Sequence, residues 1–341
     1  MDFFNILLAA PSAVAILSAF PHGVLRMRPA TVLAVVALAF ISCGPTKAPP
    51  IAGDHKLTRL TERVYVLHGS NELPNKINQG FMNNPGFVLT KKGAVVIDPG
   101  SSVQVGELVL KKIAAVTKDP VVAVFNTHIH GDHWLGNQAI KAAYPKTVIY
   151  AHPKMKAKTA TDGAGWVTLL NAMTDGAVRG TQPVAPDMHI EHDETLALNG
   201  THFRIYHNGK AHTDGDIMIE VVEEKVMFLG DNALVDRIGR MDDGDFKGNV
   251  AALEMALHTG AQHFVPGHGP SNGRVVAEGY RDYLKALHTE VKKYYDQGVS
   301  DFDMKPKVAA ALTRFRAWKD FEDQLGKHIS LAYLQIEADA F

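Results

Sequence analysis

The chain has 341 residues, of which 46% are hydrophobic and 21% are charged. That composition is typical of a globular protein and excludes an intrinsically disordered one. The 35 basic and 36 acidic side chains nearly cancel, which disfavours nucleic acid and anionic membrane surfaces as partners of the folded body.

Residues 1–43 have the pattern of an export signal. A second apolar run, at residues 30–41, follows Arg26 and Arg28 and leads to Cys43. Read from Met27, which is a candidate true start, this run is too short for a full membrane span. The letters LAFISC resemble a bacterial lipoprotein signal, so we predict an exported, periplasmic protein with a lipid anchor on Cys43. An ordinary cleavable signal and an uncleaved helical anchor are the alternatives.

The cysteine content limits the kinds of metal site. Cys43 is the only cysteine of the chain. A disulfide framework and a cysteine-rich zinc site are therefore excluded, and any metal must be held by nitrogen and oxygen. Residues 44–56 are rich in Pro, Gly and Ala, which predicts a tether between the anchor and the folded body.

Strand-like and helix-like segments alternate from residue 57 onward. Strands are predicted at 64–69, 86–90, 93–100, 121–127, 147–152 and 263–269, with several more between 189 and 229. Helices are predicted at 103–116, 135–143, 154–173, 249–259 and 273–295. Because the two kinds of segment interleave, the sequence favours an α/β layered fold.

The last forty residues carry apolar side chains three, four or seven positions apart, at Val308, Leu312, Phe315, Trp318 and Leu325. This spacing predicts an amphipathic helix. We expect residues 299–341 to form a helical extension that packs on the body; a helix that binds a partner is the alternative.

The segment THIHGDHWLGN contains the most informative motif, HxHxDH, formed by His128, His130, Asp132 and His133. At a strand end, residues two apart point the same way, so His128 and His130 can share one metal ion. Asp132 and His133, at the turn into the next helix, face a second position beside it. The motif thus predicts four ligands for two neighbouring metals.

Three more candidate ligands follow along the chain. His212 lies in the loop GKAHTDGD, and Asp231 and His268 come directly after apolar strands. Each of them alone is more often a surface residue or a helix cap than a ligand. Their occurrence together behind HxHxDH favours a shared metal site at the strand ends.

These motifs together resemble those of the metallo-β-lactamase superfamily, and VVIDPG around Asp98 is similar to its first motif. The resemblance extends over residues 57–288, within a domain that we place at 57–298. It implies a four-layer αββα sandwich with two metal ions, usually zinc, and a small-molecule substrate. It assigns the first ion to His128, His130 and His212, and the second to Asp132, His133 and His268. Asp231 would bridge the ions, and Asp98 would orient ligands without binding metal.

The chemistry implied is hydrolysis. Two divalent ions about 3.5–4 Å apart lower the pKa of a shared water from about 15.7 toward neutrality. The resulting metal-bridged hydroxide would attack an ester, lactone, thioester or lactam. Asp132 would be the catalytic residue, since its free oxygen can accept a hydrogen bond from the hydroxide and carry a proton to the leaving group.

The substrate class is less defined. Zinc β-lactamases of the superfamily typically have cysteine or serine in place of Asp231, and a nearby lysine or serine for the drug's carboxylate, whereas Arg237 is the nearest cation here. An aspartate bridge is more similar to glyoxalase II, to lactonases and, weakly, to exported hydrolases of quinoprotein systems. A β-lactamase proper, an iron-dependent persulfide dioxygenase and a non-catalytic periplasmic metal-binding lipoprotein are the alternatives.

Two segments are candidates for the substrate pocket. Residues 69–86 can form a flap over the metals in which Phe81 and Met82 touch substrate, or an ordinary loop with a buried aromatic residue. Trp134 follows His133, and packing of its side chain into the core is favoured over a place in the pocket.

Overall fold

The computed structural model describes residues 46–340. The predicted signal region and Cys43 lie outside the described residues. Among those described, no helix combines the length and apolar character needed to cross a membrane.

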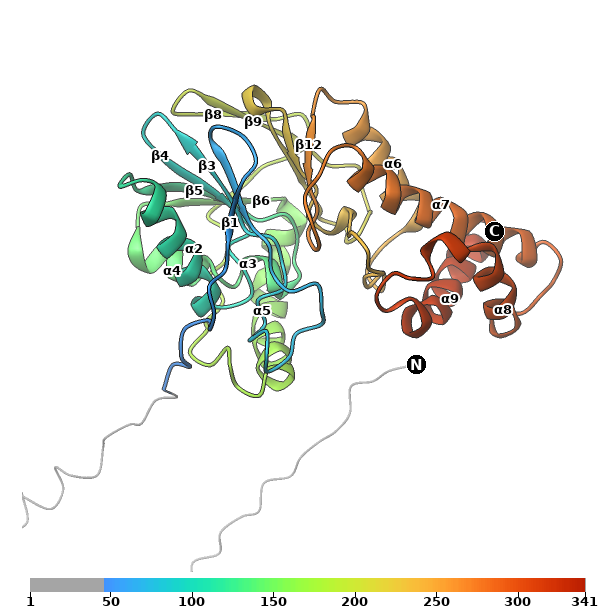
Figure 1. The fold of residues 1–341 in the computed structure, drawn as a ribbon. Coiled ribbons are helices and arrows are strands. Elements are labelled where there is room, and N and C mark those ends of the chain that lie inside the picture. Colours follow the sequence, from blue (N-terminus) through green and yellow to red (C-terminus); the bar gives the residue numbers. More distant parts are fainter. Residues whose placement is uncertain (1–45, 341) are drawn as a thin grey trace, which may run out of the picture. The chain divides into compact units, whose positions relative to one another are not determined.

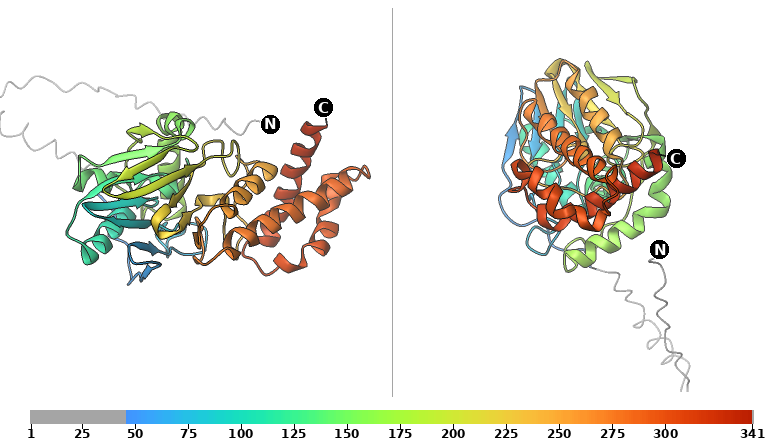
Figure 2. Two further views of the ribbon diagram at one scale, coloured as in Figure 1. Left: turned by 90° about the horizontal axis from the view of Figure 1, so that it is seen from above. Right: turned by 90° about the vertical axis from the view of Figure 1, so that its right-hand side faces the viewer.

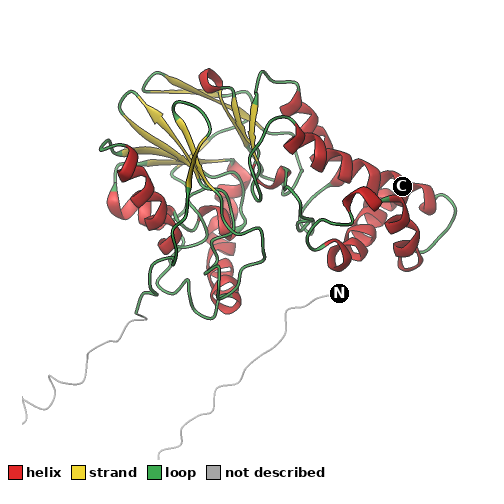
Figure 3. Cartoon of the chain, viewed as in Figure 1, coloured by secondary structure: helices red, strands yellow, loops and turns green. Residues whose placement is uncertain are grey.

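The described chain forms two β-sheets (Figures 1 and 3). The first follows chain order: β1 (Leu57–Arg59), β2 (Val64–Leu67), β3 (Gly86–Thr90), β4 (Gly93–Ile97), β5 (Val121–Phe125), β6 (Val148–Ala151) and β7 (Met188–His189). The second has the order β12 (His263–Val265), β11 (Val226–Phe228), β10 (Met218–Val221), β9 (Thr201–Tyr206) and β8 (Thr195–Leu198). Strands β4 to β7 pair in parallel, as do β11 and β12.

Eight helices of the described chain surround the sheets. Those before the second sheet are α2 (Val103–Val116), α3 (Gly131–Trp134), α4 (Asn137–Ala143) and α5 (Pro153–Met173). Those after it are α6 (Phe246–Leu257), α7 (Val275–Tyr295), α8 (Asp301–Ala311) and α9 (Phe321–Asp339). Helices α6 to α9 gather on the side of β12 (Figures 1 and 2).

Strand alternation accounts for the layers. In β4, Val95 and Ile97 face the second sheet and join a core with Phe203 and Phe228, whereas Val96 faces α2. Both faces of this parallel region are therefore buried, which is why its strands are continuously apolar. The outer face of the second sheet packs on α6 and α7. This arrangement confirms the predicted αββα sandwich.

The two sheets approach closely at Gly86. A Cβ placed on this residue would lie 2.2 Å from Cε1 of Phe228 on the opposite sheet. Only a residue without a side chain fits there.

The predicted single helix near the carboxyl terminus is wrong. The segment folds as α8 and α9, separated by a 3₁₀ turn at Thr313–Phe315. The break has a backbone cause, because Asp320 adopts a φ of 62° that a right-handed helix cannot contain. The apolar positions are still buried, since Leu312, Phe315 and Leu325 join the core formed with α7.

Part of the predicted tether is ordered against the body. The backbone N–H of Ala48 donates to the carbonyl of Arg179 over 3.0 Å, and the Ala48 side chain is buried. Ile51 packs on the core beneath α2. Residues 46–56 therefore lie on the domain rather than hanging free of it.

Candidate metal centre

Strand ends deliver the candidate ligands to one edge of the sandwich. Asp98 follows β4 and the HxHxDH segment follows β5, and these strands are parallel. Asp231 follows β11 and His268 follows β12, which are also parallel. The carboxyl ends of parallel strands meet at the same sheet edge, so distant segments of the chain converge.

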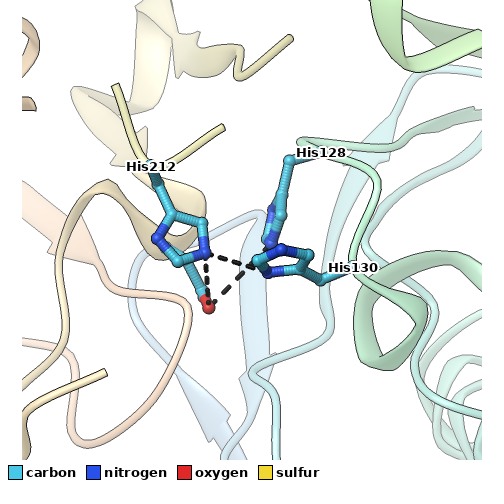
Figure 4. Close-up of side chains that lie close together, drawn as sticks. His128, His130 and His212 are labelled. Atoms are coloured by element: carbon cyan, nitrogen blue, oxygen red, sulfur yellow. Dashed lines mark hydrogen bonds and ion pairs between the residues drawn. The ribbon is translucent and has the colours of Figure 1, made fainter. Parts of the chain in front are cut away.

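The first group of donors consists of His128, His130, His212 and Asp231, all of them buried, with one donor atom from each within 4.8 Å of the others. Nε2 of His212 lies 3.0 Å from Nδ1 of His130. Figure 4 shows the three imidazole rings converging from two separate segments of the chain. Such a set of nitrogen and oxygen donors can hold one divalent ion.

The second group consists of Asp132, His133 and His268. Oδ2 of Asp132 lies 3.4 Å from Nε2 of His133 and 3.2 Å from Nε2 of His268. These donors are buried beside the first group.

Asp231 reaches both groups. Its Oδ2 lies 3.5 Å from Nε2 of His212 in the first group and 3.3 Å from Nε2 of His268 in the second. Its Oδ1 lies 3.1 Å from Nε2 of His133. This carboxylate is placed where a ligand shared by two ions would lie.

Asp98 orients the surrounding donors. Its Oδ2 lies 2.8 Å from Nδ1 of His133 and also accepts a hydrogen bond from the Thr127 hydroxyl, while Oδ1 accepts from the Thr127 backbone N–H. A proton held on Nδ1 of His133 leaves Nε2 free to bind a metal. The carbonyl of Met82 has the same role for His268, whose Nδ1 lies 2.8 Å away.

Two acidic residues that sequence reasoning missed support the site. Oδ2 of Asp243 lies 3.2 Å from Nε2 of His130, on the far side of the ring from His212. Asp216 is buried and accepts hydrogen bonds from the backbone and hydroxyl of Thr213, which shapes the loop that carries His212. The motif HTDGD contained a signal for Asp216, because aspartate commonly closes such turns; Asp243 had no comparable signal.

The charges of the site are strongly coupled. Burial and the neighbouring His133 ring lower the pKa of His128 well below its usual range. Burial and His130 lower the pKa of His212 to about 3. For His268 burial also lowers the pKa, but Asp231 and Asp132 outweigh it and raise the pKa to about 9.

Without metal, protons on the second group therefore balance its buried carboxylates. Burial raises the pKa of Asp231, but His268 and His133 outweigh burial and hold that pKa well below its usual value. A bound cation must displace the protons that these histidines carry.

Unsatisfied atoms show that the pocket fits a metal ion. Nε2 of His128, Nε2 of His133 and Oδ1 of Asp231 are buried and have no hydrogen-bond partner among the described residues. Buried polar atoms are almost always satisfied, so these three indicate a missing ligand. All seven predicted donors thus meet at one centre that suits a divalent metal, commonly zinc.

A cavity of about 90 Å³ opens on the donors His130, Asp132, His212, Asp231 and His268. Residues Leu73, Pro74 and Met82 of the segment 69–86 line it from one side, and helix α5 lines it from another through Trp166, Leu169, Leu170 and Met173. Arg237 and Arg240 complete the wall.

The two aromatic candidates have other surroundings. Phe81 is 1% exposed and packs in the core between α2 and the first sheet, so it does not line the cavity. Trp134 is fully buried and its indole N–H donates to the carbonyl of Ile129 over 2.7 Å, as the core reading predicted.

Comparison with known proteins identifies the family. A sequence model of the metallo-beta-lactamase superfamily matches residues 78–268, which is more than half of the chain and contains all seven donors. The chain belongs to this superfamily. It is accordingly a metallohydrolase of the metallo-beta-lactamase superfamily, as the motifs predicted.

Several members of the superfamily resemble the chain. A probable metallo-hydrolase of Streptococcus pyogenes serotype M6 is 24% identical over 57% of this chain and 82% of its own length. The hydroxyacylglutathione hydrolase of Synechococcus sp. strain JA-3-3Ab is 29% identical over 48% of this chain, which spans 52% of that enzyme. The structure of an inverting sec-alkylsulfatase from Pseudomonas sp. has a TM-score of 0.66 and 16% identity, and the match covers 82% of this chain and 50% of that one. The last likeness shows the fold alone.

Proposed function

We propose that the protein is a binuclear zinc-dependent hydrolase that cleaves a carbonyl-type bond in an ester, lactone, thioester or lactam. The observation that carries this proposal is the placement of Asp231 within 4 Å of ring nitrogens from both donor groups. A carboxylate so placed suits two ions held side by side. The first ion would be held by His128, His130 and His212, and the second by Asp132, His133 and His268.

Bound zinc would supply Lewis acidity, which activates a water as nucleophile and polarises the carbonyl. Asp132 supplies the proton chemistry. One of its oxygens faces His133 and His268, and the side chain lines the cavity, so the other oxygen can accept a hydrogen bond from a water there. His133 and His268 outweigh the effect of burial and hold the Asp132 pKa well below its usual value, so the carboxylate is ionised and ready to accept a proton.

The bridging residue supports a non-lactamase substrate. Asp231 occupies the position where zinc β-lactamases typically have cysteine or serine, and Ala233 and Leu234 follow it. An oxygen bridge is typical of the glyoxalase II type, and a hydroxyacylglutathione hydrolase is among the similar proteins. Thioesters and esters are therefore the first substrates to test.

The test is a panel of thioester, ester, lactone and lactam substrates with the zinc-loaded chain, alongside an alkyl sulfate and a phosphodiester. We expect turnover of at least one carbonyl substrate, lost on chelation and in Asp132→Asn while zinc is still bound. The control is Asp175→Asn, which changes an exposed aspartate that pairs with Lys76. Turnover confined to the sulfate or the phosphodiester would refute the proposal.

Metal analysis after native purification tests the cofactor separately. We expect about two zinc ions per chain, as a binuclear site requires. Predominance of iron would instead support the dioxygenase alternative, and full zinc occupancy without any turnover would support a metal-binding protein.

We also propose that the chain is exported and anchored by a lipid on Cys43, on the strength of the LAFISC motif. Labelled fatty acid should be incorporated by the wild type and not by Cys43→Ser. Incorporation that persists in the variant would contradict the proposal.

A further inference from the structure

Arg237 places a cation in the cavity wall beside the metal-binding donors. The residue is only 4% exposed, yet it lines the same cavity as Asp132, Asp231 and His268. Its Nε donates to Oδ2 of Asp320 over 3.0 Å. A buried guanidinium is costly unless its charge and its donors are paired.

Most donors of this guanidinium have no partner. An arginine carries five N–H donors, and only the one on Nε is used in a hydrogen bond within residues 46–340. Nη1 is buried without any partner among the described residues. Because Asp320 occupies the Nε side, the edge formed by Nη1 and Nη2 is available, and that edge matches the two oxygens of a carboxylate.

The carboxyl-terminal extension holds Arg237 in place. The backbone around it pairs with residue 319, since Ile238 N–H donates to the Lys319 carbonyl and Lys319 N–H donates to the Asp236 carbonyl. Asp320 directly precedes α9. Residues 319 and 320 therefore form part of the support of the active-site wall, although they lie beyond the segment that the family model matches.

The same short segment also reaches the flap. Nζ of Lys319 lies 3.1 Å from Oε1 of Glu72, in the loop that contributes Leu73 and Pro74 to the cavity. The amide of Asn71 donates to the carbonyl of Val235 over 3.0 Å. The flap, the loop of Arg237 and the extension are thus connected by direct contacts.

The opposite wall of the cavity is apolar and incompletely covered. Leu73, Leu169 and Met173 line the cavity and are 44%, 41% and 38% exposed. Large apolar side chains around a cavity mouth favour a ligand with an apolar body. The cavity therefore combines an apolar wall, a metal centre and one buried cation.

We propose that Arg237, positioned by Asp320 of the carboxyl-terminal extension, binds a carboxylate on the substrate, whose remaining body is apolar and lies against Leu73, Leu169 and Met173. This inference rests on the proposed hydrolase function and narrows its substrate class to amphipathic carboxylates. The competing role for the Arg237–Asp320 pair is purely structural, a tie between the extension and the loop.

A matched pair of substrates tests the proposal. The mono-4-nitrophenyl ester of glutaric acid carries a terminal carboxylate, and 4-nitrophenyl pentanoate has the same acyl length without it. Both are assayed with the full zinc-loaded chain. We expect Arg237→Gln to lower the ratio of kcat/KM for the charged over the neutral ester by about tenfold to a hundredfold, mainly through KM.

Three further variants separate the roles. Arg204→Gln is the control, because Arg204 pairs with Asp193 outside this cavity, and it should leave the ratio unchanged. Arg237→Lys keeps the charge but loses the planar fork, so it should restore the ratio only in part. Asp320→Asn should reduce the ratio while sparing turnover of the neutral ester.

A purely structural tie predicts a different result. Both esters would then slow equally in Arg237→Gln, the ratio would stay at its wild-type value and only the melting temperature would fall, which would overturn the proposal. Calorimetric binding of 4-phenylbutyrate and the neutral 4-phenylbutanol gives a readout without turnover. If the wild type hydrolyses neither ester but binds 4-phenylbutyrate about tenfold or more tightly than Arg237→Gln does, the hydrolase proposal fails and the carboxylate site stands. Equal binding by the two proteins would refute the site.

Discussion

Replacement of Asp98 by asparagine should weaken the second metal site without changing the backbone. Asp98 has a φ of 50°, in the left-handed region that asparagine also tolerates. Its two oxygens face three donors, which are Nδ1 of His133 and the hydroxyl and backbone N–H of Thr127. An amide has only one oxygen, so its NH₂ group must face at least one of these donors.

Either orientation of the amide has a cost. With its oxygen toward His133, the NH₂ faces the Thr127 backbone N–H and leaves a buried donor unpaired, which costs about 1–3 kcal/mol of unfolding free energy. With its NH₂ toward His133, the proton of that ring moves to Nε2, which is the atom that faces Asp132 and Asp231. Loss of such an orienting partner typically lowers metal affinity about tenfold to a hundredfold.

Chelator competition with zinc is the assay. We expect the second zinc ion of Asp98→Asn to bind about tenfold to a hundredfold more weakly, while the ion held by His128, His130 and His212 is retained. The control is Asp187→Asn, since Asp187 also accepts a backbone hydrogen bond, from Ile149, but lies away from the donors. A folded Asp98→Asn protein with two unchanged zinc affinities would refute the orienting role.

Two further predictions concern packing and pH. In Gly267→Ala the new Cβ would lie 1.8 Å from Oδ1 of Asp231, so we expect calorimetry to show loss of the tight binuclear zinc site, whereas Gly279→Ala, with no atom within 4 Å of its Cβ, should bind zinc normally; two tightly bound ions in Gly267→Ala would contradict this. Burial lowers the pKa of His328 to about 4 from the model-peptide value of 6.5. The unfolded chain therefore takes up a proton that the folded chain excludes, and urea unfolding should show about 3 kcal/mol of stability, present above pH 6.5, being lost as the pH falls to about 4. His328→Gln should lack this part of the pH dependence, and an identical pH profile in both proteins would argue against it.

The sequence predicted the candidate site well because strand ends bring separate motifs together. HxHxDH has a fixed local spacing, so His128, His130 and His133 were recognisable without a structure. Asp231 and His268 each followed a clear apolar strand, and their convergence follows from the parallel pairing of β4 with β5 and of β11 with β12.

Contacts between distant segments were not predictable in this way. Asp243 reaches His130 across 113 positions of sequence, and Asp320 reaches Arg237 across 83. Neither aspartate stands in a motif, and an exposed or capping aspartate has the same local pattern. The division of the carboxyl-terminal helix was also missed, because apolar spacing continues through the turn while the backbone of Asp320 reverses its φ.

The sequence by itself determined the layered α/β fold and the identity of the metal-binding donors, because both depend on local periodicity and on short motifs with fixed spacing. Only the tertiary structure decided what surrounds those donors: the carboxylate that orients His133, the apolar wall from α5 and the flap, and the buried Arg237 with its partner from the extension. These features depend on which faces of separate elements meet, and that is settled by packing of the whole domain rather than by any one segment.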